Sequence, residues 1–143
     1  KVDLGPDFVG DPTTVEVKVQ AYRGIFPMEE HTVFLNANSE YSVPLSVPGE
    51  VSIAVKPSHW LRTKLAAKTM TGGTVEFPDI APTNGDVDGD NAITVFDYGV
   101  LSDAFDSSDG SSNWDARADL DGDGSVTVFD YGILSDNFDL QGD

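Results

Sequence analysis

Two near-identical stretches decide the fold: DVDGDNAITVFDYGVLSDAFD at residues 86–106 and DLDGDGSVTVFDYGILSDNFD at residues 119–139. They align without a gap at a spacing of 33 residues and are identical at 15 of 21 positions. Chance does not produce such similarity, so the C-terminal part of the chain is an internal duplication. Each copy opens with three aspartates at alternate positions and continues into a run rich in aliphatic and aromatic residues.

In each copy the oxygen donors have the spacing of a calcium loop of the EF-hand type, at positions 1, 3, 5, 9 and 12. These donors are Asp86, Asp88, Asp90, Thr94 and Asp97 in the first loop, and Asp119, Asp121, Asp123, Thr127 and Asp130 in the second. Position 7, which supplies a backbone carbonyl, is Ala92 in one loop and Ser125 in the other. Because calcium takes roughly six to eight oxygen ligands, the sequence predicts two calcium ions, one per loop.

One helix is expected after each loop, over residues 94–105 and 127–138, because apolar residues recur there at helical spacing. Pro82-Thr-Asn-Gly85 excludes a helix before the first loop, so each unit is half of an EF-hand. The apolar residues at loop position 8, Ile93 and Val126, indicate that the two loops pair with each other. Gly99 and Gly132 indicate that the two helices cross closely.

The charge excludes several classes of partner. The net charge is -17, and residues 83–143 carry 15 aspartates with Arg117 as their one basic residue. We therefore expect no nucleic-acid partner, because like charges repel. No run of 18 apolar residues exists, so no membrane insertion is expected. The chain has no cysteine, which excludes disulfides and thiolate metal sites, and any secretion signal is presumed to have been removed.

Residues 13–82 are predicted to form a small antiparallel β-sandwich. Apolar and polar residues alternate over residues 15–22, 32–36, 41–45, 51–55 and 75–77, and turn-forming residues separate these runs. Residues 1–12 contain too many prolines and glycines for a central strand, but Val2, Leu4, Phe8 and Val9 are apolar enough to dock as an extended arm. The expected fold class is α+β and multidomain: an arm at 1–12, the sandwich at 13–82 and the pair of calcium loop–helix units at 83–143.

The tandem loops resemble the type I dockerin family over about residues 84–141. The resemblance rests on the repeated Asp-x-Asp-x-Asp motif with Asp97 and Asp130 at position 12, and on the missing entering helix. It implies a module that folds with calcium and binds a cohesin domain through a helix. Dockerins commonly carry small hydroxyl residues at loop positions 10 and 11, where this chain has Val95-Phe96 and Val128-Phe129. The N-terminal part is similar in pattern to carboxypeptidase regulatory-like and collagen-adhesin B-type sandwiches.

No catalytic set is evident, so we expect a non-enzymatic protein. His31 and His59 are the only histidines, and no oriented nucleophile accompanies either of them. Trp60 could stack on a sugar, as in a carbohydrate-binding sandwich, although its apolar neighbours Leu61 and Leu65 favour packing in the core. The segment Gly24-Ile-Phe-Pro27 forms an apolar loop tip that either plugs the core or contacts another molecule.

Three functions remain open from the sequence. The one we favour at this stage is calcium-dependent self-assembly into an extracellular fibre or surface layer, with the arm of one copy added to the sheet edge of the next copy. The second is docking to a cohesin-bearing scaffold, and the third is a carbohydrate-binding sandwich joined to a dockerin. All three place the protein outside the cell or at the cell surface.

Overall fold

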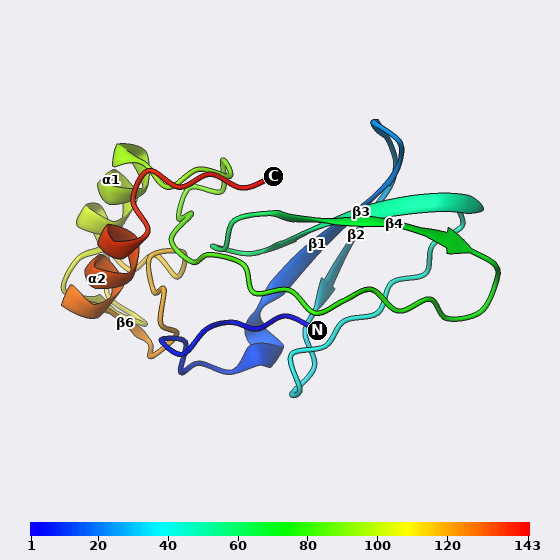
Figure 1. Ribbon diagram of the computed structural model, residues 1–143. Coiled ribbons are helices and arrows are strands. Elements are labelled where there is room, and N and C mark those ends of the chain that lie inside the picture. Colours follow the sequence, from blue (N-terminus) through cyan, green and yellow to red (C-terminus); the bar gives the residue numbers. More distant parts are fainter.

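The computed structural model describes residues 1–143, with a sheet at one end and two short helices at the other (Figure 1). A single turn of 3-10 helix at Pro12–Thr14 leads into four strands: β1 (Glu16–Arg23), β2 (Phe26–Phe34), β3 (Gly49–Pro57) and β4 (Thr63–Met70). They form one antiparallel sheet in the order β2-β1-β3-β4. The C-terminal part contains α1 (Val95–Ala104), β5 (Ser107–Ser108), β6 (Ser125–Val126) and α2 (Val128–Asp136).

Period-two patterning explains the central strands. In β1, Val17, Val19 and Ala21 are fully buried while their neighbours are exposed or half-buried. They pack with Val51 and Val55 of β3 in a cluster of 13 buried residues. The two outer strands are less buried: β2 alternates half-buried and exposed residues from Met28 to Phe34 without a fully buried position, and most of β4 is exposed. Cross-strand hydrogen bonding to β1 and β3, and not burial, therefore defines the outer strands.

The expected sandwich is present only in part. Residues 41–45 and 75–77, predicted as strands, are extended but belong to no hydrogen-bonded ladder. Tyr41, Val43, Leu45 and Phe77 still pack against the core cluster. Figure 1 shows the segment after β4 folding back beneath the sheet toward the helices. The N-terminal part thus has one hydrogen-bonded sheet of four strands, with these extended segments packed against its core.

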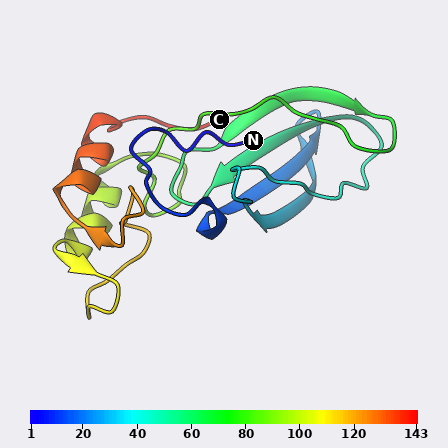
Figure 2. The same cartoon turned by 90° about the horizontal axis from the view of Figure 1, so that it is seen from below.

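The N-terminal arm lies on its own chain. Val2 forms a parallel bridge with Ile80 and is completely buried, and Leu4 is 8% exposed. The arm then runs toward the second loop and back (Figure 2). There the backbone N–H groups of Val9 and Gly10 donate to the carbonyl of Asp121, at 2.7 and 3.2 Å. The arm thus docks in a groove of its own chain, and its addition to a neighbouring copy is not supported.

The helical unit has its own core of ten buried residues, which includes Leu61 from the segment after β3. The two predicted helices are confirmed, slightly shortened at both ends. The loops do not pair with each other. Val126 pairs with Ser107 after α1, and Ile93 exchanges hydrogen bonds with Asp139 and Leu140 after α2. The segment that follows each helix thus pairs with the loop of the other repeat.

The glycines within the helices do not mark a close helix crossing. A Cβ atom on Gly99 or Gly132 would have no neighbour within 4 Å. The contact between helices is made instead by aromatic rings, with Tyr98 packed edge-on against Tyr131 at 5.0 Å between ring centroids. The expected close crossing at these glycines is therefore wrong.

A buried junction joins the sheet to the helical unit. His59 is stacked on Trp60, and burial lowers the pKa of His59 to about 4. The ring is therefore neutral near pH 7, and its Nδ1 hydrogen-bonds Asn84 Oδ1 at 2.7 Å. The amide of Asn84 donates to the carbonyl of Leu120 in the second loop. Trp60 is fully buried, which confirms the core role favoured from the sequence.

Neither helix has the length and apolar character needed to cross a membrane.

Candidate functional site

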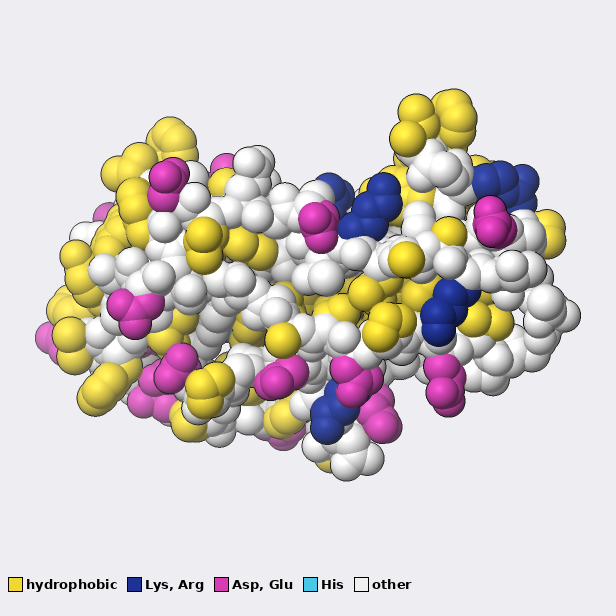
Figure 3. All heavy atoms as spheres, viewed as in Figure 1, with side chains coloured by type: hydrophobic (Ala, Val, Ile, Leu, Met, Phe, Trp, Pro, Cys, Tyr) yellow, Lys and Arg dark blue, Asp and Glu magenta, His cyan; other side chains and the backbone are white.

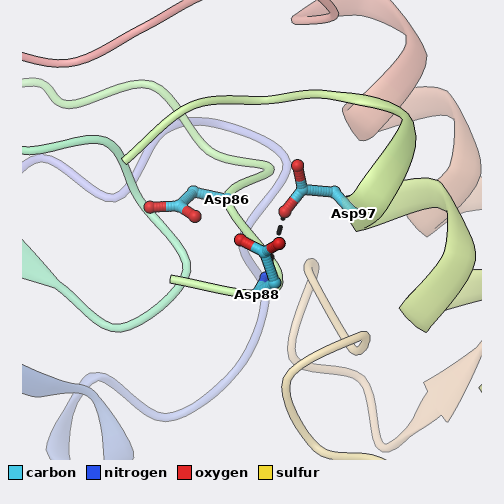
Figure 4. A group of neighbouring side chains, drawn as sticks. All are labelled: Asp86, Asp88 and Asp97. Atoms are coloured by element: carbon cyan, nitrogen blue, oxygen red, sulfur yellow. Dashed lines mark hydrogen bonds between the residues drawn. The ribbon is translucent and has the colours of Figure 1, made fainter. Parts of the chain in front are cut away.

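The first loop gathers three carboxylates. One oxygen from each of Asp86, Asp88 and Asp97 lies within 4.8 Å of the other two (Figure 4). Asp86 and Asp97 are completely buried, and Asp88 is exposed. Asp97 comes from the first turn of α1, whereas the other two precede the helix, so the cluster connects loop and helix. Its donors are all oxygen, which suits a hard divalent cation such as calcium.

The carboxylates at positions 1 and 12 also organise the first loop. Asp86 accepts the N–H groups of Gly89 and Asn91, at 2.8 and 3.0 Å. Asp97 accepts the N–H groups of Asp88 and Thr94, at 3.0 and 2.7 Å. Backbone donors thus turn both side chains inward, which fixes the ring of oxygens that a cation would meet.

The second loop repeats this arrangement. Asp119, Asp121 and Asp123 each offer an oxygen within 4.8 Å of the others. Asp119 accepts the N–H groups of Gly122 and Gly124, at 2.9 and 3.0 Å, as Asp86 does in the first loop. Asp130 is completely buried and accepts from Leu120 and Thr127, at 2.7 Å each.

Removal from solvent, followed by the proximity of like charges, raises the pKa values of several of these carboxylates. The pKa of Asp121 is raised to about 6, first because the side chain is removed from solvent and then because Asp130, Asp123 and Asp119 lie near it. The pKa values of Asp88 and Asp119 are raised for the same two reasons. Crowded carboxylates with raised pKa values gain most from a divalent cation, which neutralises the repulsion between them.

The structure brings most of the predicted ligands together, but the two loops differ in which carboxylates form the close group. Asp90 lies outside the close group of the first loop, and Asp130 outside that of the second. The hydroxyls of Thr94 and Thr127 accept the N–H groups of Phe96 and Phe129, at 3.2 Å in both loops, and so cap the two helices. The same turn is closed by the carboxylates of Asp97 and Asp130, which form a capping box with each threonine.

The first loop has a charged neighbour that the sequence does not reveal. Lys56, at the end of β3, places its ammonium 2.6 Å from Asp86 Oδ2. The same ammonium donates to the carbonyls of Ser58 and Trp60, at 3.1 and 3.0 Å. No local motif marks this lysine, because it lies 30 residues before the loop that it contacts. Asp119, the equivalent residue of the second loop, has no such partner.

The helix starts expose two equivalent apolar pairs. Val95 and Phe96 are 66% and 69% exposed, and Val128 and Phe129 are 64% and 69% exposed. Figure 3 shows hydrophobic side chains gathered over the end of the molecule that carries the helices. A second apolar projection, at the turn between β1 and β2, exposes Ile25 and Phe26, so that loop tip is not a core plug. Adjacent exposed apolar side chains are typical of surfaces that bind other proteins.

Comparison with protein families identifies the C-terminal unit. Residues 84–139 match the model of the dockerin type I domain. The match covers less than half of the chain and says nothing of residues 1–83. A search of curated proteins finds no match.

Two solved structures show the same fold over almost the whole chain. Both are crystal structures from Acetivibrio cellulolyticus described as mutants of a type II cohesin–X–dockerin complex, one altered at the N-terminal interface and the other at the C-terminal interface. Each match covers 99% of this chain and 94% of the other chain at 18% identity, with TM-scores of 0.70 and 0.69. The sheet and the helical unit therefore occur together in a known architecture.

Proposed function

We propose that the dockerin domain binds two calcium ions, one in each loop. The first ion would be held by Asp86, Asp88, Asp90 and Asp97 with the carbonyl of Ala92, and the second by Asp119, Asp121, Asp123 and Asp130 with the carbonyl of Ser125. Thr94 and Thr127 would complete the sets from position 9, directly or through water. Each bound ion would neutralise carboxylates that otherwise repel one another, and would thereby hold the loop against its helix.

We further propose that the calcium-loaded domain docks a cohesin-type domain through the starts of α1 and α2. The observation that carries this proposal is the two equivalent apolar pairs, Val95-Phe96 and Val128-Phe129. Each pair lies between the threonine that caps its helix and the aspartate at loop position 12. The family match and the descriptions of the two solved complexes support a cohesin as the partner. Valine and phenylalanine at these positions favour an interface with an apolar centre.

A binding assay against purified type I and type II cohesin domains tests this function. We expect binding in millimolar calcium, loss of binding in chelator, and at least tenfold weaker binding when Val95, Phe96, Val128 and Phe129 are all changed to alanine. The matched control changes Ile25 and Phe26, which are equally exposed but lie at the opposite end of the molecule, to serine. If the control weakens binding as much as the helix variant, or if no cohesin binds, the proposal fails.

The other functions considered from the sequence fit less well. Self-assembly required a free arm, and Val2 and Leu4 are buried within their own chain. A sugar-stacking role for Trp60 requires an exposed ring, and this ring is buried. We therefore place the chain among non-catalytic docking proteins, acting outside the cell or at its surface. We also keep the division into an arm at 1–12, a sheet domain at 13–82 and a calcium domain at 83–143, in which the two buried clusters support the division between sheet and calcium domain.

A further inference from the structure

The connection between β3 and β4 attaches the sheet domain to the first aspartate loop. The carbonyl of His59 accepts the backbone N–H groups of Gly85 and Asp86, each at 2.9 Å. Further along the connection, the N–H of Arg62 donates to Asn91 Oδ1 at 2.7 Å. Asp86 stands at position 1 of the loop and Asn91 at position 6, so the sheet domain holds the loop at its start and at its middle.

One positive charge reaches the first loop from the end of β3. The Lys56 ammonium lies 2.6 Å from Asp86 Oδ2. It also donates to the carbonyls of Ser58 and Trp60, at 3.1 and 3.0 Å, which fix its position. The lysine side chain is 16% exposed and the aspartate side chain is completely buried, so water and salt screen this pair much less than a surface ion pair. The ammonium is therefore a fixed part of the charge that a cation in the first loop would meet.

The second loop has no equivalent cation. Neither a lysine nor an arginine forms an ion pair with Asp119, which stands at position 1 of that loop. Arg117, the one basic residue of residues 83–143, pairs with Asp115 at 2.6 Å. The N-terminal arm reaches the second loop with backbone N–H groups, at the carbonyl of Asp121, and these groups carry no net charge. Two loops of nearly the same sequence thus differ by one positive charge at the carboxylate that opens the loop.

We propose that Lys56 is a positioning residue that acts on the first calcium site through Asp86. While no calcium is bound, its ammonium holds the buried carboxylate in place and offsets part of the repulsion among Asp86, Asp88 and Asp97. When calcium binds, the same ammonium opposes the ion, so the sheet domain keeps the affinity of the first site lower than the loop alone would set. This inference rests on the calcium binding proposed above.

The contact distance sets the size of the effect. Calcium binds a carboxylate oxygen at about 2.3–2.6 Å, so an ion on either oxygen of Asp86 lies at most about 7 Å from the Lys56 ammonium. At that separation, a unit positive charge weakens the binding of a divalent ion about sevenfold even at the dielectric constant of water, and more in a partly buried site. A lysine with a merely structural role would have the opposite effect, because its loss would loosen the loop and weaken calcium binding.

Two equivalent amides report on the two loops in the full chain. The N–H of Gly89 donates to Asp86 at 2.8 Å. The N–H of Gly122 donates to Asp119 at 2.9 Å. Both can be followed by NMR while a chelator buffers the free calcium concentration. Lys56→Met should lower the calcium midpoint at Gly89 at least fivefold and change the midpoint at Gly122 less than twofold. In calcium-free solution, the variant should speed hydrogen exchange at the Gly89 amide at least tenfold, because Asp86 loses its counter-ion.

Three further variants separate charge from structure. Lys56→Gln is also neutral but keeps a hydrogen-bond donor for the neighbouring carbonyls. It should lower the Gly89 midpoint as the methionine variant does, and it provides the test if the methionine variant does not fold. Lys56→Arg keeps the charge and should hold the midpoint within twofold of the unmodified chain. Lys18→Met removes a lysine that lies opposite Lys56 on β1 and pairs with Glu30 of β2 at 3.9 Å. This control should change the Gly89 midpoint less than twofold.

Three results would overturn the proposal. The first is a Gly89 midpoint that stays the same or rises in both neutral variants of Lys56. The second is a shift in the arginine variant, or in the Lys18 control, as large as that of the neutral variants. The third is unchanged exchange at the Gly89 amide in calcium-free solution. If neither glycine amide of the unmodified chain responds to calcium, the calcium sites are wrong and this inference falls with them. A response of both amides without a shift in the neutral variants refutes the role of Lys56 alone.

Discussion

The contact between the N-terminal arm and the second calcium loop can be tested at a single glycine. Gly122, at position 4 of that loop, has a φ of +76°. A Cβ atom at this position would lie 2.6 Å from Cε2 of Phe8 and 2.9 Å from Cα of Gly10. Gly10 cannot move away freely, because its N–H and that of Val9 are bonded to the carbonyl of Asp121. Gly122→Ala should therefore force the arm off the loop.

The repeat supplies a matched control for this variant. Gly89 occupies position 4 of the first loop with a φ of +82°, and a Cβ atom there would meet nothing within 4 Å. Gly89→Ala should cost only the left-handed backbone strain, about 1–2 kcal/mol. Gly122→Ala should add the cost of overpacking against the arm, about 1–3 kcal/mol, for a total of about 2–5 kcal/mol. The difference between the two variants isolates the contact with the arm.

Urea unfolding in saturating calcium measures both losses, followed by circular dichroism and by the fluorescence of the two tryptophans. Trp60 packs edge-on against Phe8 at 5.3 Å between ring centroids, so its emission also responds to displacement of the arm. In a Phe8→Ala background, the excess cost of Gly122→Ala should shrink, because one of its two close neighbours is gone. Equal losses for Gly89→Ala and Gly122→Ala would refute the arm contact.

Other outcomes follow from the proposed calcium sites. Asp97→Ala and Asp130→Ala should each remove one of the two calcium ions in calorimetric titration, while amide protection in β1 and β3 persists. If both variants keep two sites of full affinity, the aspartate at position 12 is not a ligand. In chelator, the second loop should lose stability as the pH rises from about 3.8 to about 6, because burial and neighbouring carboxylates raise the folded-state pKa of Asp121 to about 6, and its ionisation then opposes folding. Melting temperatures across this range should become flatter in Asp121→Asn, and an unchanged slope would contradict the assignment. Removal of calcium should lower the melting temperature of residues 84–141 more than that of the sheet. Hydrogen exchange can follow the two parts of the chain separately.

The two aspartate loops could be predicted from the sequence because their determinants are local. All the donors of one loop lie within twelve residues, and Thr94 and Asp97 both cap the helix and close the loop. The helix positions and the carboxylate clusters are accordingly found where the repeat placed them. Their assignment as calcium ligands, and the count of two ions, stay predictions until metal binding is measured.

The errors occurred where long-range pairing decides the structure. β4 has an exposed surface with little alternation, and it is a strand because β3 pairs with it. Ile93 and Val126 have the apolar character expected of paired loops, but each pairs with the tail after the helix of the other copy. Lys56 forms an ion pair with Asp86 only because β3 ends beside the first loop. None of these contacts leaves a periodic signal in the sequence.

The two loops have nearly the same sequence but different surroundings. The exposed apolar pairs at the helix starts are nevertheless alike in both repeats. The sheet domain contacts the first loop through Lys56 and the second through the arm, at Asp121. At the helix starts, however, both loops present valine and phenylalanine between a threonine cap and a buried aspartate, with nearly equal exposures. Because Asp97 and Asp130 belong to both the loop and the helix, a bound ion would fix the direction in which each pair projects. Calcium would then control docking by orienting these side chains, without touching the partner.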